Sequence, residues 1–432
     1  MNRILPVVVL FAWAVIVQAV PPRVTAGRMP VPPTLDGRIK TDEWSKATEI
    51  TSFHLFRSEL AGAVSPRYPT TARIGYDRDN LYIAVRCEKG SRRNLKALEH
   101  KRDGKIYHDD SVEIFLNTMP ENNNYYQFAV NSLGTCYDGF SYGSSAKLSN
   151  WSSGRWQAAA YQGDDFWTVE IKIPFCIFRF GRNPTLRFNI TRNNYYPQES
   201  ISWCPIKSTS DWHQPEQFGY LDGLELADFQ SVTIGQFDFG SLAVGKNNLT
   251  IPVENHLDRE VKLKIEISLS GLSGATGGNS ITAAVPARQQ KQLIIPFELK
   301  KPDNYVFNLS VRNLAAIQPF FILESPPCEL KAGRLQIAST FYDTEPVTGY
   351  VHLLANPLPP DCELRISLTR NQAFYKTYGF KAVSPEILFP LGKLPPGYYE
   401  TKLEAVTGKH QKLWDGEAQF WVIEHFLSSA KK

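Results

Sequence analysis

The sequence predicts an all-β protein, with an N-terminal β-sandwich followed by two smaller β-sandwich domains. Many short segments alternate apolar and polar residues, as in Ser111–Asn117, where Val112, Ile114 and Leu116 share one face. This period of two is typical of half-buried strands in antiparallel sheets. Aromatic residues reach 12%, and 28 Gly and 29 Pro are spread along the chain. Such a composition favours a β-rich fold with many turns over a disordered chain.

The clearest strand signals lie in the first half of the chain. Residues 72–76 and 81–85 flank the polar segment 77–80, which predicts a hairpin with Asp77 in its turn. The same alternation predicts strands at 111–117, 126–131, 167–173 and 186–190. Trp44, Trp167 and Trp203 lie within or beside apolar patterns, so we expect them in the core.

The first residues have the pattern of a secretory signal peptide. Arg3 precedes the almost wholly apolar run 4–17, and small residues follow up to Ala19. A retained membrane anchor is the alternative, but the run is shorter than the roughly 20 residues that span a bilayer. We therefore expect cleavage after residues 1–19, no membrane span afterwards, and a secreted, periplasmic or cell-surface protein. The net charge of +4 is small for 432 residues and gives no reason to expect a nucleic-acid partner.

The six cysteines offer no metal or redox motif, because none forms a Cys-x-x-Cys pair. An exported protein meets an oxidising space, where disulfides persist. Cys328 and Cys362 can pair with each other, and buried free thiols are the alternative.

Two breaks divide the chain into predicted domains. Tryptophan disappears between the region of Asp228 and Trp414, and a Pro-Pro pair precedes Cys328. The strand-like runs of 231–324 suit an immunoglobulin-like sandwich of about 100 residues. The segment 393–399 resembles the turn before a late strand of a fibronectin type III or macroglobulin-like sandwich. The predicted parts are a signal peptide at 1–19, the N-terminal sandwich at 28–227, the immunoglobulin-like sandwich at 228–325, the fibronectin type III or macroglobulin-like sandwich at 326–426 and a tail at 427–432.

An ordered set of short motifs runs through the N-terminal sandwich. Leu-Asp-Gly at 35–37 precedes Asp-Glu-Trp at 42–44, and Asp-Asp-Ser-Val-Glu-Ile-Phe occupies 109–115. Gln-Phe-Ala-Val-Asn follows at 127–131, and Trp-His-Gln-Pro-Glu-Gln-Phe-Gly closes the set at 212–219. Together these motifs resemble the family 9 carbohydrate-binding modules over about 195 residues.

The resemblance implies a site in which a sugar lies between two aromatic rings, with polar side chains bonding its hydroxyls. By motif, the rings fall on Tyr107 and Trp212, and the polar positions fall on Glu113 and Asn131. This chain has Ala129 where the family can have arginine. Flat rings suit the C–H faces of sugars, and carboxylates or amides suit their edges, in line with pockets that combine apolar walls with a few polar groups. Structural alternatives are packing of the rings at the sandwich edge and an ordinary polar role for Glu113 and Asn131 on a solvated sheet face.

The resemblance also implies that a structural calcium ion can be held. Calcium prefers carboxylate and carbonyl oxygens from loops. By residue type alone, the candidates are Asp103, Asp109, Asp164 and Asp165.

These observations predict a non-catalytic, secreted carbohydrate-binding protein that supports polysaccharide attachment or catabolism beside glycoside hydrolases. An extracellular scaffold that kept the fold without sugar binding is the alternative. A hydrolase of O-glycosyl compounds is a minor alternative, because such enzymes need two carboxylates across the scissile bond. The chain carries none of the nucleophile-elbow, zinc-protease or phosphate-loop motifs.

Overall fold

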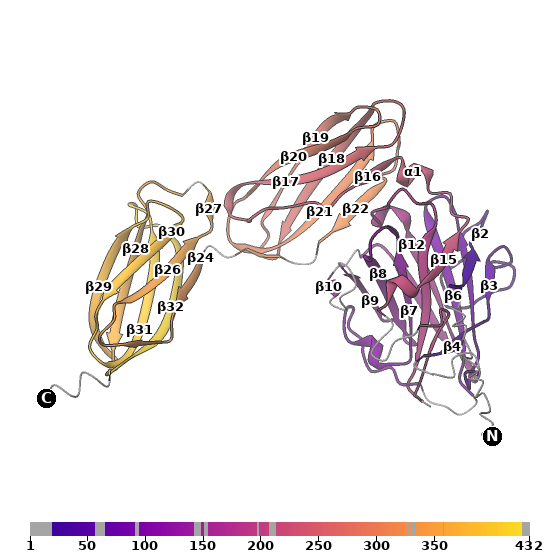
Figure 1. Cartoon of the computed structure of the whole chain (residues 1–432), viewed down its shortest axis with the longest axis horizontal. Coiled ribbons are helices and arrows are strands. Elements are labelled where there is room, and N and C mark those ends of the chain that lie inside the picture. The colour runs from indigo at the N-terminus through magenta and orange to yellow at the C-terminus, as the bar shows by residue number, and fades with distance from the viewer. Residues whose placement is uncertain are drawn as a thin grey trace, which may run out of the picture. The chain divides into compact units, whose positions relative to one another are not determined.

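The computed structural model describes residues 20–425 except 57–64, 91–94, 142–147, 151–153, 197, 207–212, 326–327, 331–332 and 357. The predicted signal peptide and the tail from 427 lie outside the described residues. The described chain is almost entirely β-structure, which confirms the predicted fold class. It divides into two compact units (Figure 1). The N-terminal unit comprises residues up to 150, 156–174 and 183–225, and the C-terminal unit comprises the rest.

Two sheets build the N-terminal unit. In the described part, a nine-stranded sheet has the order β1-β15-β13-β7-β8-β9-β10, with β14 on β13 and β4 on β14. A six-stranded sheet has the order β11-β12-β6-β5-β2, with β3 on β5. The strands are β1 (Arg23–Thr25), β2 (Gly27–Arg28), β3 (Thr48–Ile50), β4 (His54–Leu55), β5 (Thr70–Tyr76), β6 (Asn80–Glu88), β7 (Ser111–Asn117), β8 (Tyr125–Asn131), β9 (Cys136–Ser141), β10 (Leu148–Asn150), β11 (Gln157–Gln162), β12 (Phe166–Pro174), β13 (Leu186–Asn194), β14 (Glu199–Ser202) and β15 (Gly219–Asp222).

The core lies between these sheets and follows from the alternation in sequence. Ile114 on β7 pairs with Phe128 on β8 and Ile190 on β13, and all three side chains are fully buried. The inner face also holds Arg192 of β13, which is buried too. Its Nη1 donates to Thr70 Oγ1 at 2.9 Å and its Nη2 to the Glu88 carbonyl at 2.6 Å. Both partners belong to the six-stranded sheet, so this arginine joins the two layers.

The predicted hairpin forms β5 and β6. Their register pairs Tyr76 with Leu81, and the Asp77 carboxylate accepts the backbone N–H groups of Asp79 and Asn80 at 2.8 and 2.7 Å. Aspartate commonly fixes turns in this way. The predicted strands at 111–117, 126–131, 167–173 and 186–190 are likewise confirmed as parts of β7, β8, β12 and β13.

A loop covers the outer face of the six-stranded sheet. Trp44 is 1% exposed and packs on Tyr82 and Ala84, and its indole N–H donates to Glu170 Oε1 at 2.8 Å. The Asp36 and Gly37 N–H groups donate to the other Glu170 oxygen at 3.1 and 2.9 Å. Gly37 has φ +79°, and a Cβ there would lie 2.5 Å from the Ala160 carbonyl carbon, so only glycine fits. Trp167 and Trp203 are 0% and 5% exposed, which confirms the three predicted core tryptophans.

Two short parallel strands begin the unit. Arg23 of β1 pairs with Tyr220 of β15 in the nine-stranded sheet. Gly27 of β2 pairs with Gly75 of β5 in the six-stranded sheet. Consecutive residues of one short segment thus extend both layers.

The C-terminal unit contains two further pairs of sheets (Figure 1). The first pair has the orders β16-β17-β20, with β27 on β17, and β19-β18-β21-β22, with β23 on β21. The second has the orders β24-β26-β30 and β25-β32-β31-β28-β29. The strands are β16 (Val232–Ile234), β17 (Val244–Asn255), β18 (Val261–Gly271), β19 (Thr276–Val285), β20 (Gln290–Leu299), β21 (Asp303–Asn313), β22 (Phe321–Glu324), β23 (Cys328–Leu330), β24 (Gly333–Ile337), β25 (Thr340–Tyr342), β26 (Val347–Leu353), β27 (Ala355–Asn356), β28 (Glu363–Arg370), β29 (Ala373–Lys381), β30 (Glu386–Gly392), β31 (Gly397–Val406) and β32 (Lys412–Ile423). The exact domain boundaries stay predictions.

The helical elements are short. They are η1 (Ile106–His108), η2 (Phe175–Ile177), η3 (Pro215–Gln217) and α1 (Ala227–Gln230). No helix in the described part of the chain is both long enough and apolar enough to cross a bilayer.

The three buried cysteines Cys87, Cys204 and Cys362 carry free thiols. Burial raises the pKa of Cys87 to about 11 and that of Cys204 to about 12. Such thiols are inert because little thiolate forms near neutral pH. The Cys328 side chain lies outside the described residues, and the free thiol of Cys362 argues against the predicted pairing.

Candidate functional site

A row of side chains crosses the outer face of the nine-stranded sheet. Tyr137 of β9 pairs with Ala129 of β8, and Ala129 pairs with Glu113 of β7. Glu113 in turn pairs with Thr191 of β13, which pairs with Ser202 of β14. Directly opposed side chains lie about 4.5–5.5 Å apart at Cβ. Five strands therefore bring chemically different groups together around one carboxyl group.

Glu113 is the centre of this row. Its side chain is 1% exposed, and Asn193 Nδ2 donates to its Oε1 at 2.6 Å. Gln127 Nε2 donates to the other oxygen, Oε2. Burial raises the pKa of Glu113 to about 7, against the opposing effect of these two hydrogen bonds. Near neutral pH the group is therefore divided between its acid and carboxylate forms.

Two buried polar atoms beside Glu113 lack a hydrogen-bond partner among the described residues. They are Gln127 Oε1 and Thr191 Oγ1, on side chains that are 3% and 0% exposed. Buried polar groups are almost always paired, and an unpaired one costs about 1–3 kcal/mol. The cluster thus keeps one acceptor and one hydroxyl ready for an external polar group.

Two tyrosines adjoin the same cluster. The rings of Tyr107, in η1, and Tyr137 are 6.3 Å apart at 82°. Burial raises the pKa of Tyr137 to about 12, and negative charge on Tyr107 and Glu113 adds to this rise. Tyr107 remains 42% exposed. Ala129 lies between Tyr137 and Glu113 in the strand register, and its side chain is only a methyl group.

Asn131 has a different role from the predicted one. Its Nδ2 donates to the Glu99 carbonyl at 2.9 Å and to Asp109 Oδ2 at 3.0 Å. Its Oδ1 accepts the N–H groups of Leu133 and Thr135 at 3.1 and 2.9 Å. Both donors and both acceptor positions of the amide are thereby occupied. The side chain fixes two loops, and the prediction that it binds a ligand is not supported by this geometry.

Trp212, the second predicted ring, lies outside the described residues, so the predicted ring pair stays a prediction. The next residue, His213, is described. Its Nδ1 lies 2.8 Å from the Tyr125 hydroxyl, and its ring is 5.5 Å from that of Phe115 at 83°. Phe115 lies two residues from Glu113 on the same strand face. The chain therefore returns to the outer face directly after Trp212.

The predicted calcium ligands are not gathered in the described structure. Asp109 accepts the N–H groups of Leu98 and Glu99 at 3.1 and 3.0 Å, which anchors a loop. Within the described ranges, no three His, Cys, Asp or Glu side chains lie together as a metal site would require. Calcium binding stays a prediction.

Sequence reasoning found Glu113 and Tyr107 but missed Gln127, Tyr137, Thr191 and Asn193 as members of the cluster. The alternation in β8 does place Gln127 on the same face as Ala129. This pattern in the sequence is enough to assign Gln127 to the face that carries Glu113. Asn193 follows Arg192, a charged residue on the buried face of β13. The arginine breaks the apolar–polar alternation, so the sequence pattern does not show that β13 continues to Asn193.

The chain was compared with protein families, curated proteins and solved structures. Residues 35–224 match the family model described as carbohydrate family 9 binding domain-like. No curated protein matches the chain. Similar solved structures include a candidate carbohydrate-binding protein from Bacteroides uniformis ATCC 8492, with 14% identity and a TM-score of 0.39, covering 46% of this chain and 97% of that chain.

Two more are structures of a carbohydrate-binding module of family 9 from Caldicellulosiruptor kristjanssonii. The glucose complex has 15% identity and a TM-score of 0.34, and covers 46% of this chain and 95% of that chain. The cellotriose complex has 16% identity and a TM-score of 0.35, and the match covers 48% of this chain and 96% of that chain. On the family match, residues 35–224 are a carbohydrate family 9 binding domain-like domain, which makes up less than half of the chain.

Proposed function

We propose that the N-terminal unit binds a carbohydrate at the outer face of its nine-stranded sheet, around Glu113. The observation that carries this proposal is the buried carboxyl group of Glu113 flanked by two unpaired polar atoms, Gln127 Oε1 and Thr191 Oγ1. A sugar offers hydroxyls that both donate and accept, so adjacent hydroxyls satisfy all three groups. The family match of residues 35–224 supports the same conclusion.

The two tyrosines complete the proposed recognition. Tyr107 is exposed enough to lie against the C–H face of a sugar, and Tyr137 supports it edge-on. Trp212, next to His213, supplies the second ring in this proposal. Aromatic faces combined with few polar groups are the usual composition of small-molecule sites.

We further propose that this role is attachment without hydrolysis, in an exported protein. A glycosidase needs a second carboxylate roughly 5–10 Å from the first. The acidic neighbours in sequence serve other purposes, because Asp109 anchors a loop and Asp110 accepts the N–H groups of Lys96 and Tyr195 at 2.7 and 3.1 Å. Sequencing the mature N-terminus tests export: a start at Val20 agrees with cleavage after residues 1–19.

Binding of cellotriose and glucose to the purified chain tests the site, by isothermal titration calorimetry. We expect Glu113→Gln to weaken binding about ten- to a hundredfold, because a hydrogen bond to a charged group contributes about 1.5–3 kcal/mol. The matched control is Glu121→Gln, which changes an exposed carboxylate in the same unit and leaves affinity unaltered.

Thr191→Val separates a ligand-binding role from a structural one. The valine keeps the shape and removes a hydroxyl that has no partner in the described structure, so stability does not fall. Sugar affinity falls if this hydroxyl bonds the ligand. Failure of a broad glycan array to show any binding by the folded wild-type chain contradicts the proposal and favours the scaffold alternative. Release of reducing sugar that Glu113→Gln abolishes contradicts the non-catalytic role.

A further inference from the structure

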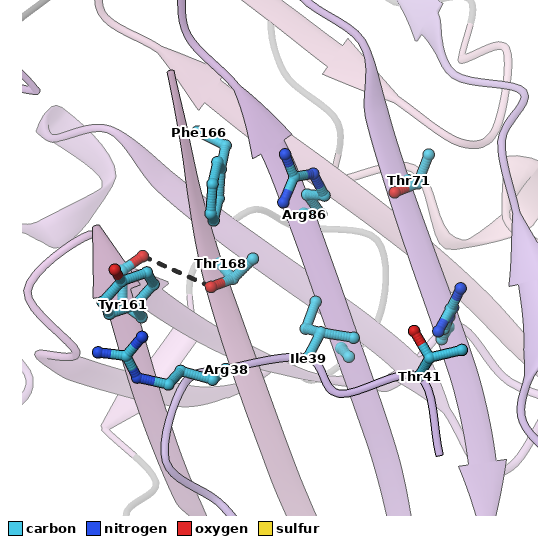
Figure 2. A pocket seen from close by; sticks show the side chains of 10 residues that line it. Arg38, Ile39, Thr41, Thr71, Arg86, Tyr161, Phe166 and Thr168 are labelled. Carbon is cyan, nitrogen blue, oxygen red and sulfur yellow. Dashed lines mark hydrogen bonds between the residues drawn. The ribbon is translucent and has the colours of Figure 1, made fainter. Parts of the chain in front are cut away.

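A pocket lies on the other sheet of the N-terminal unit. It has a volume of about 260 Å³ and opens on the outer face of the six-stranded sheet, where the segment 38–41 crosses strands β11, β12, β6 and β5 (Figure 2). Pockets for drug-sized ligands span about 300–1,000 Å³, so this one suits a single ring with its substituents. Glu113 and its partners line the opposite sheet, so this pocket is no part of the site proposed above.

Two stacked arginine–aromatic pairs form the walls of this pocket. The guanidinium carbon of Arg38 lies 3.7 Å from the centre of the Tyr161 ring, and that of Arg86 lies 3.7 Å from the centre of the Phe166 ring. Figure 2 shows Arg38 beside Tyr161 at the lower left of the view and Arg86 beside Phe166 above them. Stacking occupies the flat face of a guanidinium and leaves its N–H edge free to bond in the plane. Each pair thus fixes the orientation of its guanidinium group before any ligand arrives, and the Nε–H of Arg86 already donates to Glu88.

The three arginines that line the pocket differ in their ion pairs. Arg86 pairs with Glu88 at 2.7 Å, and Arg73 pairs with Glu49 at 3.1 Å. Arg38 is exposed and forms no side-chain ion pair within the described ranges. The Asp36 carboxylate lies near enough for the charge of Arg38 to help lower its pKa, but its ion pair is with Lys40 at 2.9 Å. The guanidinium stacked on Tyr161 therefore keeps its N–H edge for a ligand.

The remaining lining is small and partly polar. Ala84 is fully buried and presents only a methyl group, while Thr41 and Thr71 bring hydroxyls. Thr168 donates its hydroxyl to the Gly37 carbonyl at 2.5 Å, which fixes the start of the crossing segment over the sheet. A ring with several hydroxyls and one anionic group matches these walls better than a purely apolar molecule or a bare anion does.

We propose that this pocket binds one anionic sugar unit, a sugar that carries a carboxylate or a sulfate group. Arginine forks bond both groups through paired N–H donors. The threonine hydroxyls bond the sugar hydroxyls. The acidic group lies at the N–H edge of Arg38, which forms no side-chain ion pair in the described chain.

The test compares four probes by calorimetry on the full chain, first in Glu113→Gln, where the first proposed site is weakened: glucuronate, glucose 6-sulfate, glucose and sodium acetate. We expect glucuronate or glucose 6-sulfate to bind in this pocket at least about tenfold more tightly than glucose and acetate, since a charge-assisted bond adds about 1.5–3 kcal/mol. Whichever of these two sugars binds more tightly shows whether the pocket prefers a carboxylate or a sulfate group. Arg38→Gln removes the guanidinium charge that forms no ion pair in the described chain and is expected to weaken this binding about tenfold or more. Arg259→Gln makes the same change of charge at an exposed position of the C-terminal unit and serves as the matched control.

Glu113→Gln separates this proposal from the first one. Binding of the acidic sugar that persists in Glu113→Gln and falls in Arg38→Gln supports a second, independent site. Equal affinities of wild type and Arg38→Gln overturn it, and so does acetate binding as tightly as glucuronate. Loss of acidic-sugar binding in Glu113→Gln alone also overturns it, because the ligand then occupies the first site.

Discussion

Trp44→Ala is expected to lower the free energy of unfolding of the N-terminal unit by about 3–5 kcal/mol, the usual range for truncating a buried tryptophan. Trp44 is 1% exposed, and its indole fills the space between the crossing segment and Tyr82 and Ala84. Its N–H also donates to Glu170, whose buried carboxyl group has few other donors. The alanine leaves both a cavity and an unpaired carboxyl oxygen.

Trp44→Phe divides this loss into its two parts. The phenyl ring keeps most of the packing but has no N–H, so we expect a loss of about 1–3 kcal/mol from the unpaired Glu170 oxygen alone. Residue-resolved hydrogen exchange of the full chain measures both effects, in β6 and β12, where the affected contacts lie. Tyr196→Ala, at a tyrosine 57% exposed, is the control and is expected to change stability little. Equal protection in Trp44→Ala and wild type contradicts the proposed anchoring.

The second large effect concerns pH. The carboxyl group of Glu113 titrates at an ordinary value of 4.5 in the unfolded chain and at about 7 in the folded one. The folded state therefore binds the proton more tightly, so its stability relative to the unfolded chain falls as pH rises from 4.5 to 7. The difference between the two pKa values corresponds to a loss of roughly 3 kcal/mol in the free energy of unfolding. This loss is complete above the pKa of the folded state.

Denaturant unfolding at a series of pH values checks this expectation against Glu113→Gln. The amide cannot ionise, so the wild type loses stability relative to this variant between pH 4.5 and 7. Glu121→Gln removes an exposed carboxylate and is expected to run parallel to wild type throughout. Parallel curves for wild type and Glu113→Gln show instead that the carboxyl group titrates normally.

Local patterns predicted the strands well because one face of each sheet is buried. The pattern of Ser111–Asn117 alone gives β7 its bounds and places Glu113 on the outer face. The Gly-rich stretch 271–278 has the composition of a loop, but only 272–275 form a turn, and the rest belongs to β18 and β19. Gly277 and Gly278 pair with Leu269 and Ser268, and a Cβ at Gly278 would lie 2.6 Å from the Ile267 carbonyl oxygen. Glycine at these positions permits a close approach between strands. From composition alone, the same glycines would indicate a turn.

Side-chain roles were harder to predict because their partners are distant in sequence. Asn131 resembles a ligand-binding residue by motif, yet its amide bonds Asp109 and the Glu99 carbonyl, 22 and 32 residues away. Trp44 was expected in the core, but its hydrogen bond to Glu170 spans 126 residues. Periodicity reports which face a side chain occupies and carries no information on which remote group meets it there.

The two short parallel strands at the start of the N-terminal unit set the order in which it can be completed. Synthesis proceeds from the N-terminus, so β1 exists long before β15 at Gly219–Asp222, its strand partner in the described chain, has been made. Pairing across such a separation closes nearly the whole unit into one loop, and contacts of this kind form slowly. The residues between β1 and β15 must already be arranged for the pairing to be favourable. A strand that is made early is thus among the last to find its place.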